Sequence, residues 1–190
     1  MTSDFDKWLN AIRRLPSTGK EHDQVIRVFQ TILEYIVQNR WQGASPHISS
    51  AVFMVLLREL EIPAKLLMGQ CAIEDVVFDH SWVEIRGLVY DVAITHPVML
   101  EKQICPVLAG KAVDGVGMPR VRYGVKFRPN LELEAQLIIE TPFSKYMENF
   151  SEYRQGLWEI AKEIGKRAGL KLNVEKLRKK HADIRWQTAS

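Results

Sequence analysis

The 190-residue sequence predicts an α+β fold, with helices toward both ends of the chain and an antiparallel sheet between them. Apolar residues recur at helical spacing in the first third of the chain. Three consecutive segments then have strand character, and helical spacing returns toward the C-terminus. Helices and strands that are segregated along the chain in this way are typical of α+β proteins.

Three helices are predicted in the N-terminal part. The first covers residues 4–15 and has one apolar face, and the second runs from about residue 21 to residue 39. The third runs from about residue 46 to residue 60, because Ser45 is suited to the N-cap and Pro46 to the first helical position. This third helix is apolar nearly all round, so we expect it to be the buried central helix of the fold.

The sheet is predicted from three segments, at residues 64–71, 77–85 and 88–94, which alternate or run apolar. A turn at Arg86-Gly87 joins the last two segments. We therefore expect a packed antiparallel sheet against the central helix.

The remaining segments are less regular. Residues 96–122 are rich in proline and glycine and predict irregular structure, and residues 123–127 predict a further strand. Residues 131–139 fit either a helix or a strand. Helices are predicted at residues 150–168 and 174–184.

Domain organisation follows from these elements. We expect one α+β domain at residues 1–145 and a basic helical extension at residues 146–190 that packs on it. Residues 160–190 hold nine Lys or Arg and three Asp or Glu, a local net charge of +6 within an overall charge of +3. Such a segment predicts either contact with an anionic partner or a solvated helical face.

Composition places the chain among soluble proteins. It is 46% hydrophobic and 26% charged, and no apolar run approaches the roughly 18 residues that span a membrane. The acidic N-terminus lacks the apolar core of a signal peptide. We therefore expect a cytoplasmic protein without membrane contact; the sequence does not indicate its oligomeric state.

A histidine and an aspartate on neighbouring predicted strands form the candidate site. His80 lies in the second strand segment and Asp91 in the third. Antiparallel pairing would bring the two side chains together, and a carboxylate beside an imidazole orients and polarises it. This is the arrangement that a general base needs when it activates a nucleophile.

The helix and strands around this pair resemble the transglutaminase-like superfamily. This is the papain-like cysteine-enzyme fold, which includes the arylamine N-acetyltransferases and the lasso-peptide leader proteases. The matching pieces are residues 49–65, Gly69, residues 80–84 and Asp91, within about a third of the chain. The resemblance implies a transglutaminase/papain-like fold and a hydrolase or acyl transferase acting on a peptide, protein or small acyl substrate.

The chain departs from the family pattern at the nucleophile. The family's catalytic cysteine lies about ten residues before the leucine pair at Leu56, which here leads to Pro46, between Ser45 and His47. A Ser45 nucleophile would depend on His80 for activation, because a hydroxyl gains less than a thiol from a helix N-terminus. Ser45 is therefore a helix cap, a nucleophile, or the replacement of a cysteine.

Further side chains are candidates for the same site. Gln42 resembles the position from which papain-like enzymes supply an oxyanion donor. Trp41 and Trp82 would wall a substrate cleft or pack against the central helix. His47 is either a neutral donor to substrate or, as we expect, a surface or capping residue.

No metal or cofactor is predicted for this site. The two cysteines, Cys71 and Cys105, form neither a disulfide framework nor a zinc motif. A set of His80, Asp91 and His96 lacks the spacing of metal ligands. Two functional classes stay open: an enzyme that acts on an amide or acyl bond, and a non-catalytic descendant that serves as a binding or regulatory module.

Overall fold

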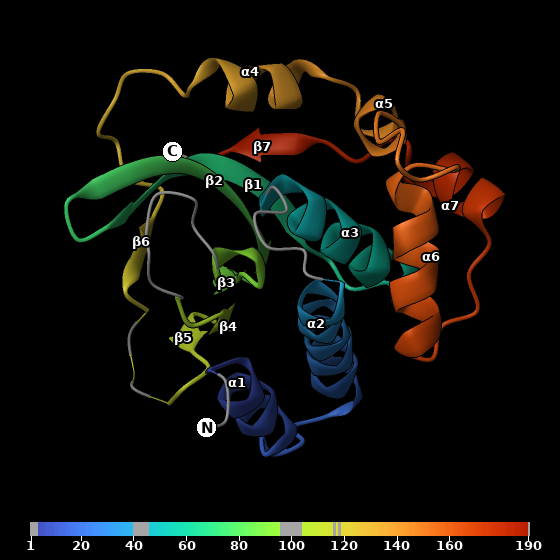
Figure 1. Cartoon of the computed structure of the whole chain (residues 1–190), viewed down its shortest axis with the longest axis horizontal. Helices are drawn as coiled ribbons and strands as arrows, with labels where there is room; N and C mark the ends of the chain where they lie inside the picture. Colours follow the sequence, from blue (N-terminus) through green and yellow to red (C-terminus); the bar gives the residue numbers. More distant parts are fainter. Residues whose placement is uncertain (1–3, 40–45, 96–103, 116, 118, 190) are drawn as a thin grey trace.

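The computed structural model describes residues 4–39, 46–95, 104–115, 117 and 119–189. A curled, largely antiparallel sheet is surrounded by helices from both ends of the chain, as Figure 1 shows. The helices are α1 (Asp4–Arg13), α2 (Lys20–Gln38), α3 (Pro46–Glu59), the short 3-10 helix η1 (Ala93–Thr95), α4 (Leu133–Glu140), α5 (Phe143–Glu148), α6 (Leu157–Arg167) and α7 (Val174–His181). The strands are β1 (Lys65–Ile73), β2 (Val76–Ile85), β3 (Leu88–Tyr90), β4 (Val107–Leu108), β5 (Lys111–Ala112), β6 (Val121–Tyr123) and β7 (Trp186–Thr188). The predicted α+β class is confirmed.

Strand β1 is the centre of the main sheet, which has the order β3-β2-β1-β6. One edge of β1 pairs along its whole length with β2 in an antiparallel register that sets Gly69 opposite His80. The other edge is shared, because β7 pairs in parallel with the first half of β1 and β6 pairs antiparallel with its end. Strands β2 and β3 are joined by a tight turn in which Arg86 and Gly87 both have positive φ, of 52° and 79°.

Helix α3 is the buried central helix that the sequence predicted. Its side chains from Ala51 to Leu57 are all at most 5% exposed, and it packs against β2 on one side and against α2 and α6 on the other. Leu66, Met68 and Val83 face it from the sheet and belong to the main core. Side chains on the opposite face of β1 and β2 form a smaller apolar cluster.

Several predicted boundaries differ from the structure. Residues 150–168 are not one helix, because α6 begins only at Leu157. Gly156 precedes it with a φ of 61°, and a β-carbon there would lie 2.2 Å from the carbonyl oxygen of Met147, so the chain turns tightly against α5 at this point. The predicted strand at residues 123–127 lies earlier, as β6, and the ambiguous segment at residues 131–139 is mainly helical, as α4.

Strand β7 was missed by the sequence analysis. It returns from α7 to the centre of the sheet, where Trp186 lies opposite Leu66 of β1. The indole ring of Trp186 is 6% exposed and meets the rings of Phe143, Tyr146 and His47 edge-on or tilted, with centroids 5.6–6.4 Å apart. The end of the chain therefore contributes to the main core. None of the described helices is long and apolar enough to cross a membrane.

We expect the Trp186→Ala substitution to lower the free energy of unfolding by about 3–5 kcal/mol, because it removes a buried aromatic side chain from the core. Denaturant unfolding of the whole chain measures this change. Gln187→Ala, at the exposed neighbouring position of the same strand, is the matched control and should cost less than about 0.5 kcal/mol. Equal effects of the two substitutions would mean that β7 does not stabilise the domain through Trp186.

Candidate active site

His80 and Asp91 are in direct contact in the interior. The Nε2 atom of His80 lies 2.7 Å from Oδ2 of Asp91, and the two side chains are only 3% and 0% exposed. His80 is fixed by the pairing of β2 with β1, and the backbone of Asp91, just after β3, exchanges hydrogen bonds with Val107. The pair is therefore held by the sheet itself rather than by a loop.

The carboxylate of Asp91 receives donors on both oxygens. Its Oδ1 accepts hydrogen bonds from the backbone N–H groups of Ala93 and Ile94, at 2.9 and 3.1 Å, where η1 begins. Its Oδ2 accepts from the hydroxyl of Tyr123 at 2.8 Å as well as facing His80. Both oxygens of the buried carboxylate are therefore satisfied by hydrogen bonds. A carboxylate only accepts, so Nε2 of the neutral His80 ring carries a proton toward it and Nδ1 is the nitrogen that can take up a proton.

Tyr123 is a site residue that the sequence analysis missed. It lies on β6 opposite Cys71 of β1, and its ring packs on Trp82 with centroids 5.0 Å apart. Loss of hydration, and after it the negative charge of Asp91, raise the pKa of the Tyr123 phenol well above its ordinary value. Tyr123 therefore remains a neutral hydrogen-bond donor to Asp91.

His47 is buried, so the predicted surface role is wrong. Its Nδ1 lies 3.0 Å from the hydroxyl oxygen of Ser81, and Ser50 of the same helix donates to the Ser81 carbonyl oxygen. These contacts hold the N-terminal half of α3 against the face of β2 opposite to that of His80. Burial, and after it the neighbouring His80, lower the pKa of His47 to about 3, so that its ring is neutral at ordinary pH.

Trp82 is a packing residue of the sheet face that carries His80. It is 2% exposed and belongs to the smaller apolar cluster with Leu67, Cys71 and Ile94. Among the described residues this cluster contains none from α3, so the alternative that Trp82 packs against the central helix is wrong, and its low exposure leaves little surface for a substrate. The other predicted site residues, Trp41, Gln42 and Ser45, lie outside the described residues.

Neither cysteine has the environment of an activated thiol. Burial, followed by the negative charge of Asp91, raises the pKa of Cys71 well above its ordinary value. Burial raises the pKa of Cys105 to about 11. Both thiols are therefore protonated at neutral pH, whereas a nucleophilic cysteine has a lowered pKa.

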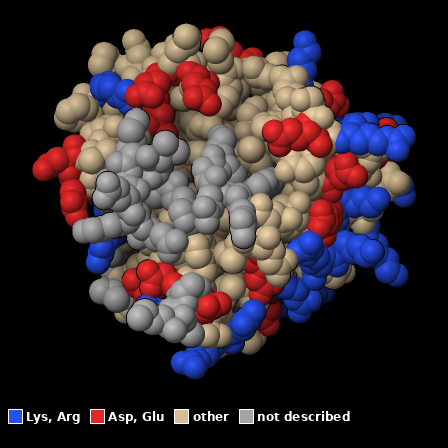
Figure 2. All heavy atoms as spheres, in the orientation of Figure 1, with Lys and Arg blue, Asp and Glu red and all other residues tan. Residues whose placement is uncertain are grey.

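The basic C-terminal surface lies away from this pair. Lys and Arg side chains gather on the right of Figure 2, where Figure 1 shows α6 and α7. Several of them are paired with acidic neighbours, as in the contacts of Arg167 with Glu163 and of Lys180 with Glu59. An anionic partner for this surface stays a prediction.

Comparison with protein-family models, curated proteins and solved structures finds no match for this chain. Across the part of the chain that the structure describes, no group of three or more His, Cys, Asp or Glu side chains is placed to hold a metal ion. The site therefore has to be interpreted from its own geometry.

We expect the Tyr123→Phe substitution to lower the free energy of unfolding by about 1–3 kcal/mol, because it leaves the buried carboxylate of Asp91 without one of its donors. Denaturant unfolding measures this change. Tyr90→Phe, which removes a hydroxyl from the opposite face of the sheet, is the control. Equal effects of the two substitutions would show that the phenol of Tyr123 does not stabilise the fold through Asp91.

The lowered pKa of His47 predicts a loss of stability in acid. Between about pH 6.5 and pH 3 the unfolded chain binds a proton at this histidine and the folded chain does not, so the free energy of unfolding falls as the pH falls, by up to about 1.4 kcal/mol per unit. His47→Gln removes this contribution. Unfolding curves at several pH values should therefore show a shallower pH dependence for His47→Gln; an identical slope would contradict the assignment.

Proposed function

We propose that this protein is a transglutaminase-like hydrolase or acyl transferase that acts on an amide or acyl bond through a nucleophile, His80 and Asp91. The observation that carries the proposal is the buried 2.7 Å contact of His80 with a carboxylate that three further donors hold in place. A general base for acyl transfer needs an orienting group that fixes one ring nitrogen. Asp91 faces Nε2 of His80 in this way.

The nucleophile of the proposal is assigned by its place in the sequence. Ser45 precedes His47, in the first turn of α3, by two residues. His47 is bonded to Ser81, whose side chain lies on the face of β2 opposite to that of His80. The labelling experiment below tests whether Ser45 and His80 act together.

The chemistry that follows is a double displacement. The hydroxyl oxygen of Ser45 attacks the carbonyl carbon while Nδ1 of His80 takes the hydroxyl proton, and backbone N–H groups at the helix start, with Gln42, stabilise the negative oxygen. The tetrahedral intermediate collapses, and His80 returns the proton to the leaving amine or alcohol. Water or an acceptor amine then releases the acyl group from Ser45 by the same steps in reverse.

A non-catalytic binding or regulatory module is the second candidate. It is favoured by the absence of a cysteine at the helix start and by the raised thiol pKa of both Cys71 and Cys105. In that case the contact of His80 with Asp91 would serve only to order the sheet. The two candidates differ in whether the nucleophile position reacts with an electrophile.

An alkyl fluorophosphonate probe for activated serine distinguishes them. We expect covalent labelling of the wild-type chain, with the rate reduced at least about 100-fold in Ser45→Ala and His80→Gln, because the first removes the attacking oxygen and the second its base. Mass spectrometry identifies the labelled residue. His181→Gln is the matched control, because His181 is also buried and also faces a carboxylate, that of Glu59 at 2.7 Å.

A wild-type chain that is not labelled under any condition would overturn the serine-enzyme proposal in favour of the binding module. Labelling that persists at the same rate in His80→Gln would overturn the role of the base. The Ser45→Cys and Pro46→Cys variants extend the test to a lost thiol. Alkylation of one of them by iodoacetamide at a rate that depends on His80 would identify the ancestral nucleophile position.

A further inference from the structure

Helix α4 exposes both of its leucines. Five of its eight residues are apolar; Ala135 is buried, and Ile138 and Ile139 are partly buried against the main core. Leu133 and Leu137, one turn apart, are 71% and 54% exposed, and the nearby Phe127 is 74% exposed. The leucines of a surface helix usually face the core. The exposed side chains of Leu133, Leu137 and Phe127, here called the α4 ridge, therefore have the character of a contact surface.

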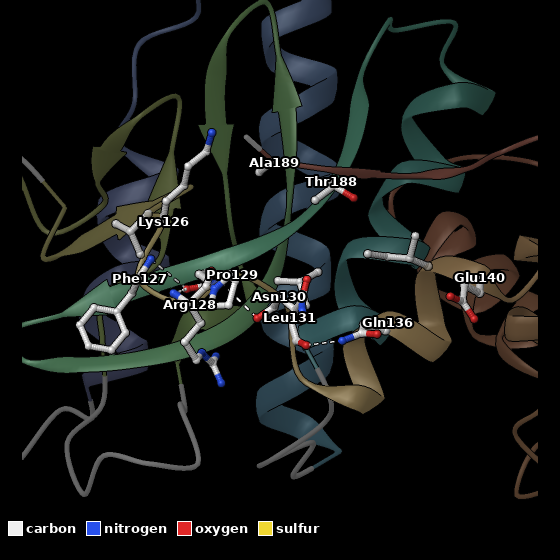
Figure 3. A pocket seen from close by; sticks show the side chains of 13 residues that line it. Lys126, Phe127, Arg128, Pro129, Asn130, Leu131, Gln136, Glu140, Thr188 and Ala189 are labelled. Atoms are coloured by element: carbon white, nitrogen blue, oxygen red, sulfur yellow. Dashed lines mark hydrogen bonds between the residues drawn. The ribbon is translucent and has the colours of Figure 1, made fainter.

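The ridge is flanked by a hollow on each side. Between α4 and α5 lies an apolar hollow of about 440 Å³, lined in part by Ile138, Tyr146 and Phe150. On the other side a groove of about 700 Å³ runs between α4 and residues 125–131, as Figure 3 shows. Leucine side chains of a helix that packs on α4 would find apolar space in the hollows beside it.

The ridge is held rigidly by the sheet beneath it. The side-chain oxygen of Gln70 accepts hydrogen bonds from the backbone N–H groups of Phe127 and Arg128, and its nitrogen donates to the Arg128 carbonyl oxygen. Asp79, opposite Gln70 on β2, pairs with Arg128 and accepts from the backbone N–H of Glu132. The surface is therefore preorganised, which lowers the entropy cost of association.

The charges along the groove have opposite sign at its two ends. Figure 3 shows Lys126 at one end and Glu140 at the other. Both side chains are exposed, and neither forms an ion pair within the described residues. A two-fold axis across α4 exchanges the ends of the groove, so that Lys126 of one copy faces Glu140 of the other. The same axis sets Leu133 of each copy opposite Leu137 of its partner.

We propose that the α4 ridge binds a second copy of this chain, with the two α4 helices antiparallel across a two-fold axis. A single surface supplies the apolar ridge, the hollows beside it and both charges, and this self-complementarity is what an isologous contact requires. The antiparallel arrangement also opposes the two helix dipoles favourably. The dimer does not depend on the proposed acyl-transfer activity.

Sedimentation velocity of the full chain between about 1 and 100 µM tests the proposal. We expect a reversible dimer whose dissociation constant rises at least about tenfold in Leu133→Glu and in Leu137→Glu, because each places a charge in an apolar contact. Leu88→Glu is the matched control: Leu88 is a 47% exposed leucine on β3 and should leave the dimer unchanged. Circular dichroism confirms that the variants are folded.

Charge reversal tests the antiparallel arrangement. Lys126→Glu and Glu140→Lys should each weaken the dimer by placing like charges opposite each other, and the double variant should regain most of the lost affinity because both charges are reversed in each copy. A chain that stays monomeric throughout the range would overturn the proposal and indicate a different protein as the occupant. A dimer insensitive to Leu137→Glu, or a double variant no tighter than the singles, would overturn it too.

Discussion

The buried carboxylate of Asp91 determines how four segments of the chain meet. A charge removed from water has to be satisfied by donors, and here they come from β2, from the first turn of η1 and from β6, while the backbone of Asp91 pairs with β4. These segments are separated by up to 43 residues in the sequence, from His80 to Tyr123. Loss of any one donor would leave a buried charge less compensated, so the geometry around His80 follows from a requirement of the fold. The contacts that satisfy Asp91 thus also fix the orientation of the His80 ring.

A second buried histidine shows which features set this pair apart. His181 contacts Glu59 at the same distance of 2.7 Å, but Glu59 also pairs with Lys180. Burial lowers the pKa of His181 in spite of its carboxylate partner. That pair joins the end of α3 to α7 and lies among further surface charges. A buried His–carboxylate contact is therefore not in itself evidence of catalysis. The two pairs differ in the partners of the carboxylate, because Asp91 accepts from two backbone N–H groups and a phenol, whereas Glu59 pairs with a lysine.

The spacing of apolar residues along the chain predicted α3, β1 and β2. These elements are buried along most of their length, so most of their residues are apolar and the sequence alone shows it. It failed where a long-range partner decides the structure. Strand β7 is three residues long, too short for alternation to register, and pairs with a strand about 120 residues earlier. Tyr123 is a polar aromatic residue without any local sign of its contact with Asp91. His47 was expected at the surface because the spacing of residues along its helix does not reveal its contact with Ser81 of β2.

The ambiguity of residues 131–139 has a different cause, since α4 points its leucines outward and so lacks the periodicity of a helix packed on a core.

The alternation of side chains along a strand relates the site to the α4 ridge. On β2, His80 points to one face of the sheet and contacts Asp91, while its neighbour Asp79 points to the other face and holds the segment that leads into α4. Gly69 and Gln70 on β1 divide in the same way, with Gln70 bonded to that segment. The two surfaces are therefore back to back on one pair of strands. A partner bound at α4 would therefore contact the segment held by Asp79 and Gln70, on the face of this strand pair opposite to His80.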